Sequence, residues 1–232
     1  MKVAVIGDLH GKPCWKHLLK DNINNFDKIV FLGDYSDDSW VTFTDKEIVD
    51  NLKDVIEFKR NNDSKVELLI GNHDFQYIVG YPTASRYRKS YADELYKIFN
   101  DNKDIFNVVY VLKDYVFSHA GITNGWINYI KKKYNTNDFN NINDITKIIN
   151  MVYSNCKEDC NIASYRRGGM NKFAGILWAD IGDLQEDGCF DYNQIVGHNR
   201  VKVNTVLEKN NHKIYMCDHF DSDDSCLIVL DV

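Results

Sequence analysis

The sequence predicts an α/β fold built on a parallel sheet, and two observations lead to this prediction. Short apolar runs rich in β-branched residues occur at 3–6, 29–32 and 66–70, and each leads directly into a glycine. Their length and composition are typical of buried strands. Helical patterns lie between these runs, and strands that alternate with helices favour a parallel sheet with crossover connections.

The helix between the second and third runs has a well-marked beginning. Residues 44–47, Thr-Asp-Lys-Glu, match the capping box, in which the Thr and Glu side chains satisfy the first backbone N–H groups. Behind this box, Ile48, Leu52 and Val55 fall on one helical face. A shorter helix is expected at 14–22, between the first and second runs.

The rest of the chain is expected to add helices and a second set of strands. One helix is predicted around 91–99, and the Asn- and Lys-rich residues 124–165 are predicted to be mostly helical. Further strands, the first two forming a hairpin, are predicted at 108–112, 115–117, 194–196, 201–207, 213–217 and 226–230.

Length and composition indicate an ordinary globular protein. The chain has 232 residues, of which 44% are hydrophobic and 27% charged, so we expect a single domain over 1–232. Within it, residues 124–165 are expected to form a helical insertion over the active face. The net charge of −6 argues against a general nucleic-acid-binding surface. Neither a membrane span nor a signal peptide is recognisable, which predicts a cytoplasmic protein without a membrane partner.

Five short motifs combine a glycine with a carboxylate, amide or imidazole side chain. In chain order they are Gly7-Asp8-Leu9-His10-Gly11, Gly33-Asp34-Tyr35-Ser36-Asp37, Gly71-Asn72-His73-Asp74, Ser118-His119-Ala120-Gly121 and Gly197-His198. Four of them follow the carboxyl end of a predicted strand, where ligands bind in open α/β sheets. Side chains that are far apart in the sequence are therefore expected to converge.

The residue types in these motifs suit a pair of metal ions. Asp8 and His10 are two positions apart and can reach one metal from the same loop, while Asp34 could bridge two metals. Carboxylate, amide and imidazole ligands without a thiolate favour manganese, with iron or zinc as alternatives. Two such ions about 3.5–4 Å apart can hold a hydroxide for in-line attack on phosphorus. The remaining candidate ligands are Asn72, His119 and His198.

His73 is a candidate for a different task. It follows Asn72 directly, so its side chain should point away from the metal that Asn72 would bind. From there it could protonate a leaving oxygen, and Asp37 is the candidate to hold its tautomer. Singly, a Gly-Asp pair is usually a turn and a buried His is usually a satisfied core residue. The ordered set at strand ends makes coincidence a poor explanation for all of them.

These residues resemble a known family, the calcineurin-like metallophosphoesterases. The first three motifs are most similar to its phosphoprotein phosphatase branch, which includes small bacterial and phage Ser/Thr phosphatases and diadenosine tetraphosphate hydrolases. Residues 118–122 and Gly197-His198 are similar to the later family motifs, and residues 176–180 resemble a Leu-Trp-x-Asp segment between them. The resemblance spans nearly the whole chain.

The resemblance implies a four-layer α/β/β/α sandwich with a two-metal centre. By the same resemblance, Asp8 and His10 would bind the first metal, and Asp34 would bridge both metals. The second metal would be held by Asn72, His119 and His198. His73, assisted by Asp37, would be the general acid.

One departure from the family pattern concerns the substrate. The phosphatase branch has a phosphate-binding arginine directly after the position of Asp37, but this chain has Asp38 there. A carboxylate at that point would repel a phosphate dianion, so either another arginine replaces it or the substrate differs from that of the branch. Arg167, beside Arg166 and two glycines, is the first candidate and Arg200 the second. A surface ion pair is the alternative interpretation for these arginines.

The function expected first is that of a Ser/Thr phosphoprotein phosphatase-like enzyme acting on a phosphorylated protein. The alternatives are hydrolysis of a nucleotide-like substrate, either a dinucleoside polyphosphate or a cyclic nucleotide, and a nuclease, which the acidic net charge disfavours. A non-catalytic binding module on the same fold is a further alternative. Such a module would be expected to have lost metal ligands or the acid, whereas this chain retains all of them.

Overall fold

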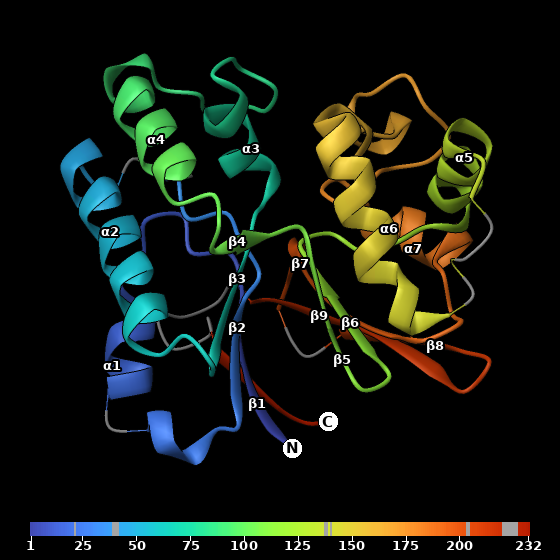
Figure 1. Ribbon diagram of the computed structural model, residues 1–232, viewed down its shortest axis with the longest axis horizontal. Helices are drawn as coiled ribbons and strands as arrows, with labels where there is room; N and C mark the ends of the chain where they lie inside the picture. Colours follow the sequence, from blue (N-terminus) through green and yellow to red (C-terminus); the bar gives the residue numbers. More distant parts are fainter. Residues whose placement is uncertain (21, 39–41, 137–138, 140, 203–204, 220–226) are drawn as a thin grey trace.

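The computed structural model describes residues 1–20, 22–38, 42–136, 139, 141–202, 205–219 and 227–232. Two five-stranded sheets lie against each other, and helices cover the outer face of each sheet (Figure 1). This is the predicted four-layer α/β/β/α arrangement. No helix among the described residues is both long and apolar enough to cross a bilayer.

The first sheet has the strand order β10-β1-β2-β3-β4. Its parallel part, from β1 through β4, confirms the β-α-β-α-β prediction, and β10 pairs antiparallel with β1. The strands are β1 (Lys2–Ile6), β2 (Lys28–Phe31), β3 (Val66–Leu69), β4 (Phe106–Asn107) and β10 (Leu227–Asp231). The helices outside this sheet are α1 (Cys14–Lys20), α2 (Asp45–Asn61) and α4 (Lys89–Asp101).

Alternation along β1 shows how this sheet joins two cores. Ala4 and Ile6 point to the helices, where they pack with residues of α1, α2 and α4. Val3 and Val5 point the other way and pack with Phe117 and other residues of the second sheet. Because both faces are covered, the strand is apolar throughout, as expected for a buried parallel sheet.

The second sheet has the strand order β5-β6-β7-β9-β8. Its outer face, including Val116 and Val196, packs against the remaining helices. The strands are β5 (Val109–Leu112), β6 (Tyr115–Ser118), β7 (Asn193–Val201), β8 (Thr205–Lys209) and β9 (His212–His219). The helices are α5 (Asn124–Tyr134), α6 (Ile142–Asn155) and α7 (Ile181–Asp187), with short 3-10 turns at Lys157–Asp159 and Tyr165–Arg167. A further 3-10 turn at Ile23–Asn25 lies between α1 and β2, on the side of the first sheet.

Some predicted elements differ from the observed ones. The single strand predicted at 201–207 is wrong, because β7 continues to Val201 and β8 begins only at Thr205. No glycine or proline marks the reversal between them, and residues 203–204 are outside the described part of the chain. Helix α3 (Asn72–Val79) begins inside the third motif and was not predicted. Residue 226, expected in the last strand, also lies outside the described residues.

Candidate metal centre

The six candidate ligands come from loops and strand irregularities at one edge of the two sheets. Three follow strands β1 and β2, one opens α3 directly after β3, and one follows β6. The last lies within β7, where the pairing with β9 shifts register between Val196 and Arg200. In this order the residues are Asp8, His10, Asp34, Asn72, His119 and His198.

The first group of ligand atoms belongs to Asp8, His10 and Asp34, and these atoms lie within 4.8 Å of one another. His10 Nε2 is 3.6 Å from Asp34 Oδ2. On the other side of the ring, His10 Nδ1 lies 2.7 Å from the carbonyl oxygen of Asp37. Since only a protonated Nδ1 can donate to that carbonyl, Nε2 is left with a lone pair directed at the carboxylates, as in metal-binding histidines.

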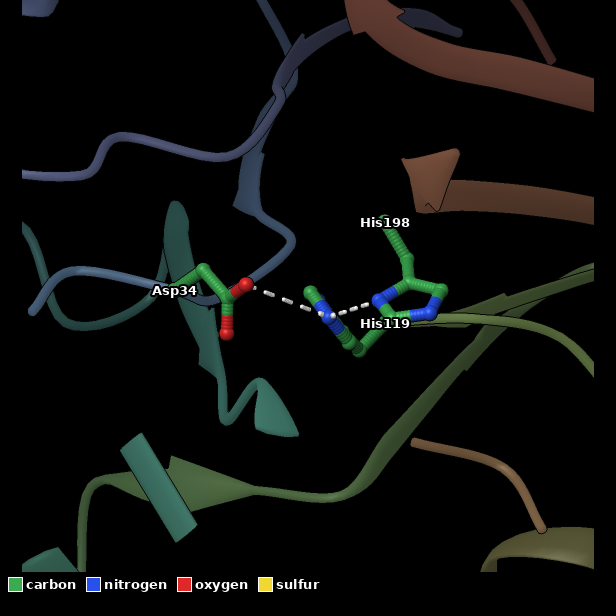
Figure 2. A group of neighbouring side chains, drawn as sticks. All are labelled: Asp34, His119 and His198. Carbon is green, nitrogen blue, oxygen red and sulfur yellow. Dashed lines mark hydrogen bonds and ion pairs between the residues drawn. The ribbon is translucent and has the colours of Figure 1, made fainter. Parts of the chain in front are cut away.

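The second group comprises Asp34, His119 and His198, whose side chains point toward one another (Figure 2). His119 Nδ1 lies 2.9 Å from the carbonyl oxygen of Leu32, which again leaves Nε2 with its lone pair. That Nε2 atom is 2.9 Å from Asn72 Oδ1, 3.2 Å from His198 Nδ1 and 3.6 Å from Asp34 Oδ2. Potential ligand atoms of four side chains thus converge, and one cation could bind all of them.

Backbone amides fix the orientation of the two aspartates. The amide of His198 donates to Asp8 Oδ1 at 3.0 Å, and the amide of His73 donates to Asp34 Oδ1 at 2.9 Å. The backbone segments that carry these amides can approach the carboxylates closely only because each segment contains a glycine. A Cβ atom on Gly197 would lie 2.5 Å from Asp8 Oδ1, and one on Gly71 would lie 2.0 Å from Asp34 Oδ1. The motif glycines therefore make room for the carboxylates.

The backbone at four motif residues is in the left-handed region. The φ angles are 46° at His10, 52° at Asp34, 61° at Asp37 and 60° at His198. For residues other than glycine this conformation costs about 1–2 kcal/mol each. Such strain concentrates at functional sites, where the surrounding structure holds side chains in a required direction.

Burial dominates the electrostatics of the ligand residues. It raises the pKa values of the Asp8 and Asp34 carboxyls well above their usual range, and the neighbouring carboxylate of Asp218 raises that of Asp8 further. Burial also lowers the pKa values of His10 and His198 well below the usual range. The imidazoles are thereby kept neutral, which is the form that binds a metal, and the buried carboxylates gain from a nearby cation.

Beside the ligands, His73 and Asp37 form the expected pair. His73 Nδ1 lies 3.1 Å from Asp37 Oδ2, and the His73 ring makes an edge contact with the His10 ring at 5.2 Å between centroids. The Asp37 carboxylate also accepts hydrogen bonds from Tyr77 Oη and Tyr91 Oη and from the Gln76 amide. Burial raises the pKa of Asp37 to about 6, although these hydrogen bonds act to lower it.

A comparison with known protein families shows which family has this arrangement of residues. A sequence model described as calcineurin-like phosphoesterase matches residues 1–198. The chain belongs to the calcineurin-like phosphoesterase family. It is therefore a metal-dependent phosphoester hydrolase, and this family generally binds two divalent metals. A comparison with curated proteins finds no match.

Solved structures share the fold of this phosphoesterase. The cold-active protein-tyrosine phosphatase of a psychrophilic Shewanella species is 17% identical and has a TM-score of 0.60, with 99% of this chain and 75% of that chain covered. A mutant of a cold-active protein tyrosine phosphatase is 18% identical and has a TM-score of 0.55, with coverages of 92% and 70%. At these identities the likeness concerns the fold alone.

Two carboxylates that sequence reasoning did not assign also support the site of the phosphoesterase. Asp74 Oδ1 accepts hydrogen bonds from the Tyr35 and Ser36 amides, while its Oδ2 accepts one from the Gly71 amide at 2.9 Å. It thus joins the loops that carry Asp34 and Asn72, and its place as fourth residue of the third motif could have indicated this. Asp218 is buried in β9, and a single acidic residue in an apolar strand was the available signal.

The two candidate arginines lie close enough to affect the site. Arg167 donates to Asp180 Oδ2 at 2.8 Å and to Asn199 Oδ1 at 2.9 Å, and its charge helps to lower the pKa of His198, after burial and His119. Arg200 is opposite Asp218 in the strand register, and its charge helps to lower the pKa values of His10 and His73. Arg166 also forms ion pairs, with Asp183 and Glu186, so the alternative interpretation as surface ion pairs fits both neighbouring arginines.

The carboxylate of Asp38 is held within its own loop. It is 5% exposed, and it accepts hydrogen bonds from the backbone amides of Thr42 and Phe43, the latter at 2.8 Å. The repulsion expected from the motif requires a carboxylate directed at the phosphate. Instead, two backbone donors neutralise part of its charge, so its repulsion of a substrate is weaker than the motif alone suggests.

Proposed function

We propose that this phosphoesterase is a Ser/Thr phosphoprotein phosphatase-like enzyme that removes phosphate from phosphomonoesters of proteins, with manganese as its preferred metal. The observation that carries the proposal is the convergence of five ligand side chains around Asp34 together with the adjacent His73–Asp37 pair. The first supports hydrolysis at phosphorus, and the second supports protonation of a poor leaving group.

Each ligand has a distinct place in this proposal. Asp8 and His10 would hold the first metal, Asp34 would contribute to both sites, and Asn72, His119 and His198 would hold the second metal. When bound, the two ions supply an activated water and neutralise charge on the phosphoryl group. The left-handed backbone at His10, Asp34 and His198 keeps their side chains directed inward before any ligand arrives.

His73 is proposed to donate a proton to the leaving oxygen from Nε2. Asp37 holds the opposite Nδ1, so that the ring presents Nε2 to the site. Burial chiefly lowers the pKa of His73, to about 3, so the imidazole is neutral in the free site. The charge of a bound phosphate dianion favours the protonated form. An acid of this kind matters most for alkyl leaving groups such as serine and threonine.

Arg167 and Arg200 are proposed to supply positive charge beside the phosphate. Arginine is suited to this because its planar guanidinium can bind two phosphate oxygens at once. The same concentration of positive charge would also suit a dinucleoside polyphosphate, which makes nucleotide hydrolysis the second candidate function.

A substrate panel with added manganese tests the proposal. It compares phosphoserine, phosphothreonine and phosphotyrosine peptides, a dinucleoside tetraphosphate, a cyclic dinucleotide and single-stranded DNA, with Asp34→Asn as the inactive control. We expect the phosphoserine and phosphothreonine peptides to have the highest kcat/KM. A higher value for a nucleotide would replace the substrate assignment, and full activity of Asp34→Asn would contradict the shared-ligand role.

A further inference from the structure

A cavity outside the metal centre lies where two hydrophobic cores meet. It is partly open to solvent and has a volume of about 370 Å³. Its lining comes from α4, from α6 and from β4, which lies between these two helices (Figure 1). Ile78 and Phe106 line it and pack against the cores on both sides. Ligand pockets often form at such junctions, and the volume falls within the roughly 300–1,000 Å³ of small-molecule sites.

The cavity is separate from the metal centre, although both adjoin α3. The described residues that line the cavity include none of the six candidate ligands, and neither His73 nor Asp37. They do include Ile70, which comes just before Gly71, and Ile78, which lies on α3. A molecule in the cavity therefore contacts the helix that carries Asn72 and His73 without contacting the ligand atoms.

Aromatic and aliphatic side chains form the interior of the cavity. Phe99 and Phe106 meet with ring centroids 5.2 Å apart and planes tilted by 59°, and Tyr153 lines the cavity from α6. Phe99 and Ile70 are buried, whereas Phe106 and Tyr153 are half-buried and keep accessible surface. Aromatic rings pack favourably against other rings in tilted and offset arrangements. The interior therefore suits a flat apolar group such as another aromatic ring.

Two lysines, Lys103 and Lys157, line the same cavity, and no acidic side chain is among its described lining residues. Lys157 Nζ lies over the Tyr153 ring, 5.4 Å from its centroid, so its charge is held against the aromatic wall. Glu158 follows Lys157 but accepts a hydrogen bond from Tyr81 Oη at 3.0 Å. Lys103 forms no ion pair or side-chain hydrogen bond within the described part of the chain. The cavity thus carries positive charge that its own lining does not balance.

We propose that this cavity binds a small aromatic carboxylate, whose ring packs against Phe99, Phe106 and Tyr153 while its carboxylate pairs with Lys103 and Lys157. A carboxylate suits the site better than a free phosphate dianion, because the apolar interior would remove water from the dianion without replacing its hydrogen bonds. Binding here does not depend on which phosphoester the enzyme hydrolyses.

Isothermal titration calorimetry of the manganese-loaded enzyme with cinnamate, and with the neutral cinnamyl alcohol, tests the proposal. We expect cinnamate to bind saturably with a Kd on the order of 1 mM or below, as ligands of this size can. The double variant Lys103→Ala with Lys157→Ala should raise this Kd roughly 3- to 30-fold, because two partly exposed ion pairs are lost. The alcohol should bind more weakly and should not respond to the loss of the lysines.

The charge-matched control is Lys97→Ala with Lys147→Ala, which removes one lysine each from α4 and α6 outside the cavity and should leave the Kd unchanged. An equal affinity for cinnamate and its alcohol, or an equal Kd in the two double variants, would overturn the proposal. Absence of saturable cinnamate binding to the wild-type enzyme would overturn it as well.

Two further variants locate the bound carboxylate. Ser154→Trp places a large ring in the lining of the cavity and should abolish cinnamate binding, while its Tm shows whether the fold is retained. Asp34→Asn alters the metal centre and should leave the affinity for cinnamate unchanged. Binding that survives Ser154→Trp but is lost in Asp34→Asn would overturn the proposal, because the carboxylate would then lie at the metals. If Ser154→Trp fails to fold, the lysine variants decide the question on their own.

Discussion

Gly71 shows how much of the centre depends on a missing side chain. The Cβ of an alanine at this position would lie 2.0 Å from Asp34 Oδ1, and both groups are buried. Either the α3 backbone or the Asp34 carboxylate must then move. Because Asp34 belongs to both ligand groups, a small displacement affects both metal positions at once.

We therefore expect Gly71→Ala to lose most bound metal and nearly all hydrolysis, and to destabilise the fold by about 1–3 kcal/mol as an overpacked core residue. Elemental analysis and thermal unfolding measure the two effects. Gly182→Ala in α7 is the matched control, since the three atoms nearest to its Cβ all belong to the flexible side chain of Arg166. Full metal content in Gly71→Ala would show that Asp34 is held less rigidly than the geometry indicates.

The His73–Asp37 pair makes a second prediction at the scale of single residues. A general acid contributes about 10²–10⁴-fold to a rate, and more for a poor leaving group than for a good one. His73→Ala should therefore slow hydrolysis of a phosphoserine peptide by that factor and affect p-nitrophenyl phosphate much less. Asp37→Asn should give a smaller loss with the same pattern. Equal losses on both substrates would assign His73 to positioning instead of proton transfer.

Asp159 joins elements in the helical layer outside the second sheet. Its Oδ1 accepts hydrogen bonds from Tyr129 Oη at 2.8 Å and Lys133 Nζ at 2.7 Å, and its Oδ2 accepts one from Tyr134 Oη at 2.6 Å. The 3-10 turn at Lys157–Asp159 is thereby attached to α5. Burial acts to raise the pKa of Asp159, but these donors outweigh it and the pKa is lowered.

This lowered pKa predicts a pH dependence of stability. The folded protein binds the Asp159 proton less readily than the unfolded chain, whose aspartates have a pKa of about 3.9. The stabilisation is therefore complete above that pH and is lost as the pH falls through the lower folded value. Asp159→Asn should lower Tm near neutral pH and flatten the decline below about pH 4. Parallel curves for both proteins would contradict this account.

Elements with strong local signals could be predicted from the sequence, and elements defined by tertiary contacts could not. The apolar runs before Gly7, Gly33 and Gly71 gave three strands, and the capping box at Thr44 gave α2 with its correct beginning. Helix α3 was missed because it starts among motif residues whose polar side chains conceal a helical face. Two strands were merged at 201–207 because apolar alternation continues across the reversal.

The same distinction holds for the site. Ligands beside glycines at strand ends could be collected from the sequence, since strand ends of one sheet edge meet in space. Asp218 has no motif, and its effect on Asp8 arises from the packing of β9 beside β1. The direction of the Asp38 carboxylate was likewise set by backbone amides that no sequence pattern announces.

On the scale of the whole molecule, the centre lies where the two sheets meet. Asp8, His10, Asp34 and Asn72 come from the side of the first sheet, whereas His119 and His198 come from the second. A metal held by residues from both sheets binds the folded arrangement and not the separated sheets. Metal occupancy should therefore stabilise the entire structure.

Removal of metal is expected to lower Tm, and the effect should depend on metal concentration. A ligand present at 100 times its dissociation constant stabilises a fold by about 2.7 kcal/mol. Thermal unfolding after exhaustive chelation, and again after stepwise addition of manganese, measures how much bound metal stabilises the fold. His119→Ala should lose most of the metal-dependent increase. A Tm independent of metal in the wild-type protein would contradict binding across the two sheets.

The pairing of β1 with β10 also affects how the protein is made. Met1 and Val232, hydrogen-bonded at this edge, are 231 positions apart in sequence. At ordinary rates of translation, β10 leaves the ribosome on the order of ten to forty seconds after β1. Throughout that interval one edge of an apolar strand has no partner, and such edges recruit other chains. Nascent molecules are thus most prone to aggregate before β10 emerges, and co-translational chaperones should improve yield more than refolding aids added afterwards.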